Sequence, residues 1–257
     1  MRSFILAYYG NTGSSWLIQM LGSAPNVHVP AFEPVEPWAW KVDEETRLRW
    51  IRNAFTPPAE RSGASFDGWV EGLAASPQFD KLLKSEFDII GFKMTSDAFS
   101  DEGPFLEMCR DLGTKLVFLH RNNRIKHALS LYRYHEEEKS QFYEPGVKPP
   151  SKVKLRTFDH WVERSAFMHD KHMGFRSDAA GFLGGDQVIE VAYEDFVDSD
   201  GKKATLATIA SFLDLDPNGF QGAIFEKATP DDLSTAVINY GKLKRHYRNS
   251  KYARFFD

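Results

Sequence analysis

The sequence predicts an α/β fold in which a central parallel β-sheet is flanked by helices. Short apolar runs bounded by turn residues alternate with longer helical patterns, an order that is typical of parallel sheets. The runs at residues 3–9, 88–94, 115–120 and 187–193 are predominantly apolar, as expected of strands covered on both faces. The chain has 257 residues without internal repeats or linker-like segments, so we expect a single domain over residues 1–257.

Helical patterns occupy the segments between and after these strands. They cover residues 14–21, 44–55, 103–112, 124–139, 154–182 and 202–213. The last pattern is the clearest, because its apolar residues recur at helical spacing and the sequence DLDPNG then ends it. We interpret that helix as structural.

Composition and charge exclude several classes of protein. Lys and Arg number 32 and Asp and Glu number 36, which gives a net charge of −4 and argues against binding of nucleic acid by bulk attraction. The single cysteine, Cys109, permits neither an internal disulfide nor a cysteine-based zinc cluster, and we expect it to be a small buried residue. No apolar run is long enough to span a membrane, and we expect a cytoplasmic protein.

The segment GNTGSSWL at residues 10–17 follows the first predicted strand and leads into a helix. Free backbone amides and the positive end of the helix dipole meet at such a turn, which suits a phosphate or sulfate group. The loop is P-loop-like, but it lacks the GK[ST] ending of a Walker A sequence and contains no lysine, which argues against a nucleoside triphosphatase. Alternatively, Thr12 or Ser14 is simply the N-cap of the helix.

Four segments in order resemble the sulfotransferases. The loop is similar to their 5′-phosphosulfate loop, and HRNNRIKHALSLYR at residues 120–133 is similar to their 3′-phosphate element, with Arg121 and Ser130 at the matching positions. VAYEDF at 191–196, which precedes IASFLDL, and the basic tail at 239–256 also resemble the family. The resemblance is closest to bacterial trehalose- and lipopolysaccharide-type enzymes and, over the first third, to Golgi-type carbohydrate sulfotransferases.

This resemblance implies an enzyme that transfers a sulfuryl group from 3′-phosphoadenosine 5′-phosphosulfate (PAPS) to an acceptor hydroxyl without a metal. The implied donor-binding residues are Asn11, Thr12, Gly13, Ser14, Ser15, Trp16, Arg121 and Ser130. Asn11 departs from the family, which usually has a basic residue there. A neutral amide lacks the charge-assisted part of that contact, worth about 1.5–3 kcal/mol per hydrogen bond.

Catalysis would depend on positioning and on stabilising charge that develops on the leaving group. Lys93 stands where the family often places a lysine near the sulfuryl group; alternatively, it is a surface residue at a strand end. The Ser14 hydroxyl would add a hydrogen-bond donor to the leaving group. Thr95 occupies the position of the histidine base of cytosolic members. Glu33 matches the glutamate that carbohydrate-type members use as the base, and Glu36 is the reserve candidate.

Several readings stay open at this point. The chain could be a non-catalytic nucleotide-binding protein of the same fold, or a P-loop nucleotide kinase. Tyr193, Glu194 and Asp195 indicate a structural junction. The basic tail folds over the 3′-phosphate or is simply solvated, and the acceptor is a sugar, a lipid or a small alcohol. Trp38, Trp40 and Trp50 are either core residues or part of an acceptor pocket. We interpret His160, His169 and His172 as surface residues rather than metal ligands. The sequence does not determine the oligomeric state.

Overall fold

Five parallel strands form one sheet in the order β2-β3-β1-β4-β5. The structure is a computed structural model that describes residues 2–29, 33, 35–37, 42–56, 88–138, 149–197, 199–220 and 232–256. The strands are β1 (Arg2–Tyr8), β2 (Val27–His28), β3 (Ile89–Thr95), β4 (Lys115–His120) and β5 (Val188–Ala192). All four predicted strands are confirmed. The two residues of β2 are too short to produce a periodic pattern in the sequence.

Strand β1 lies at the centre of the sheet and is almost entirely buried. Its side chains alternate between two cores: Phe4 and Leu6 pack on one face, and Ile5 and Ala7 on the other. Pairing with β3 is in register, so that Leu6 lies beside Lys93 and Tyr8 beside Thr95. This register places the polar carboxyl end of β3 next to the end of β1.

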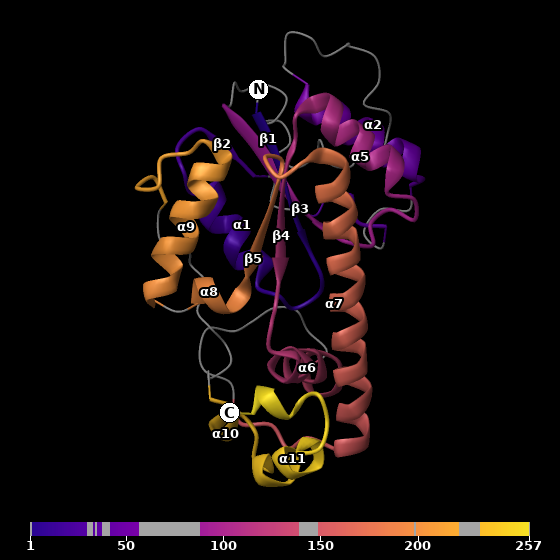
Figure 1. The fold of residues 1–257 in the computed structure, drawn as a ribbon, viewed down its shortest axis with the longest axis vertical. Coiled ribbons are helices and arrows are strands. Elements are labelled where there is room, and N and C mark those ends of the chain that lie inside the picture. Colours follow the sequence, from indigo (N-terminus) through magenta and orange to yellow (C-terminus); the bar gives the residue numbers. More distant parts are fainter. Residues whose placement is uncertain are drawn as a thin grey trace.

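Helices cover both faces of the sheet, as the alternating sequence pattern predicts. Figure 1 shows α1 (Ser14–Gly22), α8 (Tyr193–Val197) and α9 (Ser199–Leu213) on one side. The other side is covered by α2 (Glu44–Phe55), α5 (Gly103–Leu112) and α7 (Leu155–Leu183). Leu17 and Ile209 belong to the first core and Phe105 and Phe175 to the second. The predicted helices at 14–21, 44–55, 103–112, 154–182 and 202–213 are thereby confirmed, with ends that differ by a few residues.

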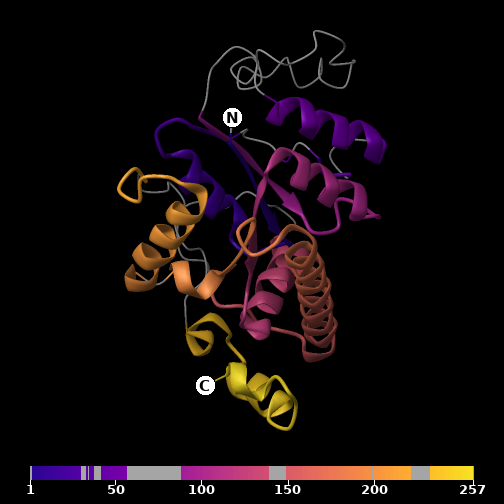
Figure 2. The ribbon, with the colours of Figure 1, turned by 45° about the horizontal axis from the view of Figure 1, so that its top comes forward.

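A third group of helices gathers beyond the carboxyl ends of the strands (Figure 1, Figure 2). It consists of α6 (Arg124–Tyr132), α10 (Leu233–Ala236) and α11 (Tyr240–Tyr247), followed by a short 3₁₀ turn, η3 (Ala253–Phe255). Leu129 of α6 and Leu243 of α11 share one buried cluster. The C-terminal tail is therefore packed against the helix that follows β4.

The predicted helical pattern over residues 124–139 is helical as far as Glu138, where the described segment ends, but its second half is not α-helical. The α-helix ends at Tyr132 and continues as a π-helical segment, η2 (Arg133–Glu138). Buried Arg133 lies at this junction, where its guanidinium donates to the Ser151 hydroxyl at 2.7 Å and to the Ala236 carbonyl at 3.0 Å. These long-range bonds satisfy a buried charge and accompany the change of helix type, which no local pattern indicates.

Two further expectations concern burial and membranes. Cys109 is fully buried in the core, as predicted, and its burial raises the pKa of the thiol. Within the described part of the chain, none of the helices combines the length and the apolar character needed to cross a membrane.

Gly91 in β3 tests how tightly the central strands are packed. A Cβ atom at this position would come within 2.2 Å of Cε1 of Phe4, which is fully buried. We expect Gly91→Ala to lower the free energy of unfolding by about 1–3 kcal/mol or more, because the ring has no free space to enter. Denaturant unfolding measures this value. The matched control, Gly174→Ala on the exposed side of α7, meets no atom within 4 Å and should be neutral or slightly stabilising.

Candidate functional site

The candidate site lies at the carboxyl edge of the sheet. The chain leaves β1 toward β2 and β3 on one side and later adds β4 and β5 on the other. In open parallel sheets, ligands bind outside the carboxyl ends of the strands where the strand order reverses in this way. Here that point is the end of β1, which is followed directly by the loop at residues 10–13.

Two residues of this loop have left-handed backbone conformations, Asn11 with φ of 61° and Gly13 with φ of 83°. Asparagine tolerates this conformation better than most side chains, and glycine adopts it freely. A Cβ atom on Gly13 would also come within 2.6 Å of the Tyr193 ring. The loop therefore requires glycine at 13 and favours asparagine at 11, where a lysine would be strained.

Helix α1 begins immediately after the loop. The Gly13 carbonyl accepts hydrogen bonds from the amides of Trp16 and Leu17, and the first turn contains no acidic residue. The amides at the start of a helix lack partners within the helix, so this end suits an anion. The Thr12 hydroxyl is fully buried and donates to the Tyr9 carbonyl at 2.8 Å, so it stabilises the loop itself.

Lys93 joins the loop to the predicted base. Its Nζ donates to Oγ of Ser15 at 2.8 Å and lies 2.6 Å from Oε1 of Glu33. The side chains of Lys93 and Glu33 are each only 15% exposed. The structure thus brings together three residues from β3, from α1 and from the segment after β2. Ser15, rather than its buried neighbour Ser14, supplies the hydroxyl that contacts the lysine.

Glu36, the reserve candidate, is fully buried. Its carboxylate accepts from the Thr95 amide at 2.5 Å and from the Thr95 hydroxyl at 2.7 Å. Desolvation, with a smaller contribution from the nearby carboxylates of Glu33 and Asp97, raises the pKa of Glu36 to about 7 despite these two bonds. A fully buried carboxyl group does not reach an acceptor, so the partly exposed Glu33 is the better-placed base.

Arg121 lies on the other side of the loop, immediately after β4. Its guanidinium is 4.5 Å from the centroid of the Tyr193 ring, and one of its nitrogens donates to the Asn11 carbonyl at 3.5 Å. The side chain is buried, and its Nε has no hydrogen-bond partner among the described residues. A buried guanidinium with an unused donor beside an anion-binding loop is suited to a phosphate.

The Tyr9 hydroxyl connects the loop to the Arg121 segment. It accepts hydrogen bonds from the Arg121 amide and from the Arg124 guanidinium, both at 2.9 Å. Its own proton is directed to the Arg121 carbonyl at 3.2 Å or to Nδ1 of His169 at 3.3 Å. One phenol at the end of β1 therefore fixes the position of the segment after β4.

Two further sets of contacts hold the same segments. The Glu194 carboxylate accepts from the amides of Asn122 and Asn123 at 2.8 and 2.9 Å, directly after Arg121. His127 of α6 lies 2.7 Å from the Gly10 carbonyl and 2.7 Å from the Ser165 hydroxyl. Burial lowers the pKa of His127 to about 3, so the ring is neutral at pH 7 and donates from Nε2 to Gly10.

Other predicted site residues are placed as follows. Ser130 is half-buried on α6 and makes no side-chain hydrogen bond to another candidate in the described ranges. The Trp16 ring packs 5.3 Å from Phe196, between centroids, and 5.3 Å from the Lys202 ammonium. Trp50 is a core residue that packs against Phe92, whereas the positions of Trp38 and Trp40 lie outside the described residues.

The expectation of three surface histidines is wrong for His172. Only His160 is exposed; His169 is partly buried, and His172 is fully buried, where it contacts the Ser96 hydroxyl. His172 lies on the face of α7 that packs against β4, with its ring centroid 5.3 Å from that of Phe118, so it is buried despite its polarity. Among the described residues, no group of three or more histidine, cysteine or acidic side chains is arranged to hold a metal ion.

The basic tail is folded, with its cations exposed. Lys242, Lys244, Arg245, Arg248, Lys251 and Arg254 are all solvent-accessible. The tail reaches the site through Asn123, whose side-chain amide donates to the Phe255 carbonyl at 3.2 Å. The turn that contains Phe255 thus contacts the residue two positions after Arg121 in the sequence.

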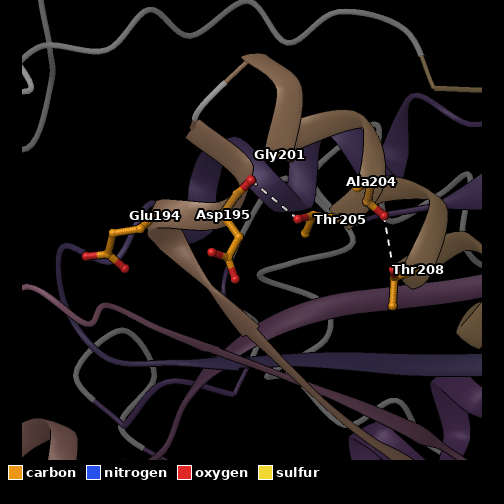
Figure 3. Close-up of a pocket in the computed structure, with 6 residues that line it drawn as sticks. All are labelled: Glu194, Asp195, Gly201, Ala204, Thr205 and Thr208. Atoms are coloured by element: carbon orange, nitrogen blue, oxygen red, sulfur yellow. Dashed lines mark hydrogen bonds between the residues drawn. The ribbon is translucent and has the colours of Figure 1, made fainter.

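A separate hollow of about 360 Å³ lies between α8 and α9. Figure 3 shows Glu194 and Asp195 on one side of it and Thr205 and Thr208 on the other. None of the predicted donor-binding residues lines this hollow. The Glu194 carboxylate is already used by the amides of Asn122 and Asn123, so we assign the chemistry to the loop edge and not to this hollow.

Sequence reasoning missed Tyr8, Tyr9 and His127. Tyr8 and Tyr9 stand at the end of an apolar strand, where a core role explains them equally well. His127 lies in a helix four residues after Asn123, a position that shows no relation to Gly10 until the fold is formed. The position of the tyrosines directly before a Gly-rich loop was the only available signal.

Comparison with known proteins supports the fold. No family model and no curated protein matches the sequence. A solved sulfotransferase from Alicyclobacillus acidocaldarius is similar at 15% identity, with a TM-score of 0.51 over 99% of this chain and 92% of that one. A sulfotransferase domain of the Synechococcus olefin synthase has 18% identity and a TM-score of 0.45, over 94% and 82% of the two chains. A mouse sulfotransferase complexed with PAP has 13% identity and a TM-score of 0.43, over 84% and 59%. The fold is that of the sulfotransferases.

Glu36 predicts a pH dependence of stability. Its pKa rises from 4.5 to about 7 on folding, so the folded protein retains a proton that the unfolded chain has lost between these values. Stability therefore falls as pH rises from about 4.5 to 7, by up to roughly 3 kcal/mol for this group. Glu36→Gln should abolish that decline, which is measured by denaturant unfolding at pH 4, 5, 6, 7 and 8. A constant difference between wild type and variant across this range would contradict the assignment; exposed Glu45→Gln on α2 is the control.

Proposed function

We propose that this protein is a sulfotransferase that moves a sulfuryl group from PAPS to an acceptor hydroxyl. The observation that supports this most is the position of the Lys93 ammonium, in contact with both the Ser15 hydroxyl of the phosphate loop and the Glu33 carboxylate. A cation at the loop and a carboxylate beside it are the two groups that in-line transfer to a hydroxyl requires.

The described residues fit a donor with phosphate at both ends of a nucleoside. The helix start at Gly13 to Ser15 offers amides to the 5′-phosphosulfate, and the first turn of α1 contains no acidic residue to compete with it. The unused Nε of Arg121 offers a donor for the 3′-phosphate. The Asn11 carbonyl joins these two places through its bond to Arg121.

In the proposed reaction, Glu33 accepts the proton of the acceptor hydroxyl, whose oxygen then forms the bond to sulfur. As the bond from sulfur to the phosphate oxygen breaks, negative charge develops on that oxygen. Lys93 and the Ser15 hydroxyl are placed to stabilise this charge at the loop. No metal ion is needed, since the transferred group is only singly charged and the leaving group is stabilised by these side chains.

Lys93 also explains how a neutral Asn11 is compatible with activity. The loop position that is basic in related enzymes has a left-handed backbone here, which asparagine accepts. We propose that the cation is provided instead by β3, through the Lys93 contact with Ser15. The charge is then supplied from the neighbouring strand and not from within the loop.

The absence of a histidine at Thr95, together with the position of Glu33, favours an enzyme of the carbohydrate type, in which a carboxylate is the base. Its acceptor would be a sugar, a lipid head group or a small alcohol, and the single reduced cysteine fits a cytoplasmic site of action.

Arg121→Met should remove the preference for a 3′-phosphate. Calorimetric titration of the wild type is expected to give tighter binding of adenosine 3′,5′-bisphosphate than of AMP. In the variant, the affinity for the bisphosphate should fall about ten- to a hundredfold while that for AMP changes little, because one charge-assisted contact is lost. Equal losses for both ligands would show that Arg121 only supports the fold. Arg156→Met, exposed on α7, is the control.

Glu33→Gln and Lys93→Met should separate proton transfer from charge stabilisation. Both variants are expected to lose at least about a hundredfold in the rate of PAPS turnover, measured with a panel of sugars, lipid head groups and alcohols as acceptors. Glu33→Gln should retain the wild-type affinity for adenosine 3′,5′-bisphosphate. Unchanged turnover in Glu33→Gln would reject Glu33 as the base.

A further inference from the structure

We infer that Tyr8 is a positioning residue for the Glu33 carboxylate. This inference rests on the proposed function, in which Glu33 is the base. Tyr8 is the last residue of β1, directly before the sequence that begins the phosphate loop, and its side chain is almost fully buried. Its hydroxyl donates a short hydrogen bond to Oε1 of Glu33.

The same carboxylate oxygen receives two donors. Nζ of Lys93 is 2.6 Å from Oε1 of Glu33, and it lies 5.1 Å from the centroid of the Tyr8 ring. Lys93 therefore contacts both the base and the ring of the residue that holds the base. Because Leu6 pairs with Lys93 and Tyr8 with Thr95 in the sheet, strand register fixes Tyr8 relative to Lys93, and the Glu33 carboxylate contacts both of them.

Tyr8 acts on Glu33 as a permanent donor. Burial raises the pKa of the phenol, and the carboxylates of Glu36, Glu33 and Asp97 raise it further. The raised pKa favours the protonated phenol, which is the form that donates to Glu33. Among the residues that the structure describes, the charged groups that face it are these three carboxylates and the Lys93 ammonium, and its hydrogen bond goes to Glu33.

This arrangement gives Tyr8 a role that Lys93 does not fill. In the proposed reaction, Lys93 stabilises charge on the leaving oxygen near Ser15, so its attraction to Glu33 weakens as transfer proceeds. The Tyr8 bond does not depend on that charge, and it keeps the carboxylate oriented while Glu33 takes the acceptor proton.

The test is a titration of Glu33 itself, which needs no acceptor. Protein labelled with ¹³C at the glutamate carboxyl carbons is titrated by NMR, and Glu33→Gln identifies the Glu33 resonance. Tyr8→Phe should raise the Glu33 midpoint by about one pKa unit, the size expected for loss of one hydrogen bond to a charged group. The control, Tyr132→Phe, removes a buried hydroxyl that accepts from the Lys154 amide, and should leave the midpoint unchanged.

An unchanged Glu33 midpoint in Tyr8→Phe would overturn the inference. If Tyr8→Phe fails to fold, a fluorotyrosine at position 8 replaces it; its more acidic phenol is a stronger donor and should lower the midpoint, and no change would again reject the proposal. Binding of adenosine 3′,5′-bisphosphate is measured on the same samples. Failure of the wild type to bind it would contradict the proposed function, whereas the Glu33 titration would still decide whether Tyr8 controls this carboxylate.

Discussion

The contacts of one ammonium group, Lys93, determine how the candidate site is organised. The lysine lies in β3, whose register with the central strand is fixed by seven paired positions. From there it reaches the loop helix at Ser15 and the segment after β2 at Glu33. The Lys93 side chain is 15% exposed and has an acidic partner at 2.6 Å, and in such a partly buried place a cation acts more strongly on an anion than it would in water.

A second constraint connects the two predicted phosphate sites. The Tyr9 hydroxyl bonds to both the backbone and the neighbouring guanidinium of the segment after β4, and the Tyr193 ring contacts both Gly13 and Arg121. The distance between the loop and Arg121 is therefore set by buried aromatic groups before any ligand binds. Preorganisation of this kind reduces the entropy lost on binding and the reorganisation needed during transfer.

Two adjacent tyrosines lie where the central strand ends, Tyr8 as the last residue of β1 and Tyr9 directly after it. The Tyr8 hydroxyl donates to Glu33, whereas the Tyr9 hydroxyl accepts from the Arg121 amide. The end of the central strand thus supports the candidate base through one tyrosine and the candidate 3′-phosphate site through the other. Neither role requires contact with the acceptor.

Local patterns predicted most of the fold. Four strands and five helices follow from apolar periodicity and turn residues, because burial on a sheet determines both the fold and the pattern. The two-residue β2 and the π-helical segment after Tyr132 did not follow, since the first is too short and the second coincides with distant contacts of Arg133. In the site, resemblance pointed to Glu33 and Lys93 separately. Their ion pair, the choice of Ser15 over Ser14, and the burial of Glu36 and His172 are products of tertiary packing that sequence spacing does not encode.

We propose that the loop and Arg121 together bind a nucleotide with phosphates at its 3′ and 5′ ends. Thermal unfolding of the purified protein with adenosine 3′,5′-bisphosphate, with AMP, and with ATP plus Mg²⁺ tests it most directly. A ligand at about 100 times its dissociation constant adds about 2.7 kcal/mol, which raises the midpoint of a chain of this size by several degrees. We expect the bisphosphate to stabilise the protein far more than AMP or ATP. Stabilisation by ATP with Mg²⁺ and not by the bisphosphate would contradict it.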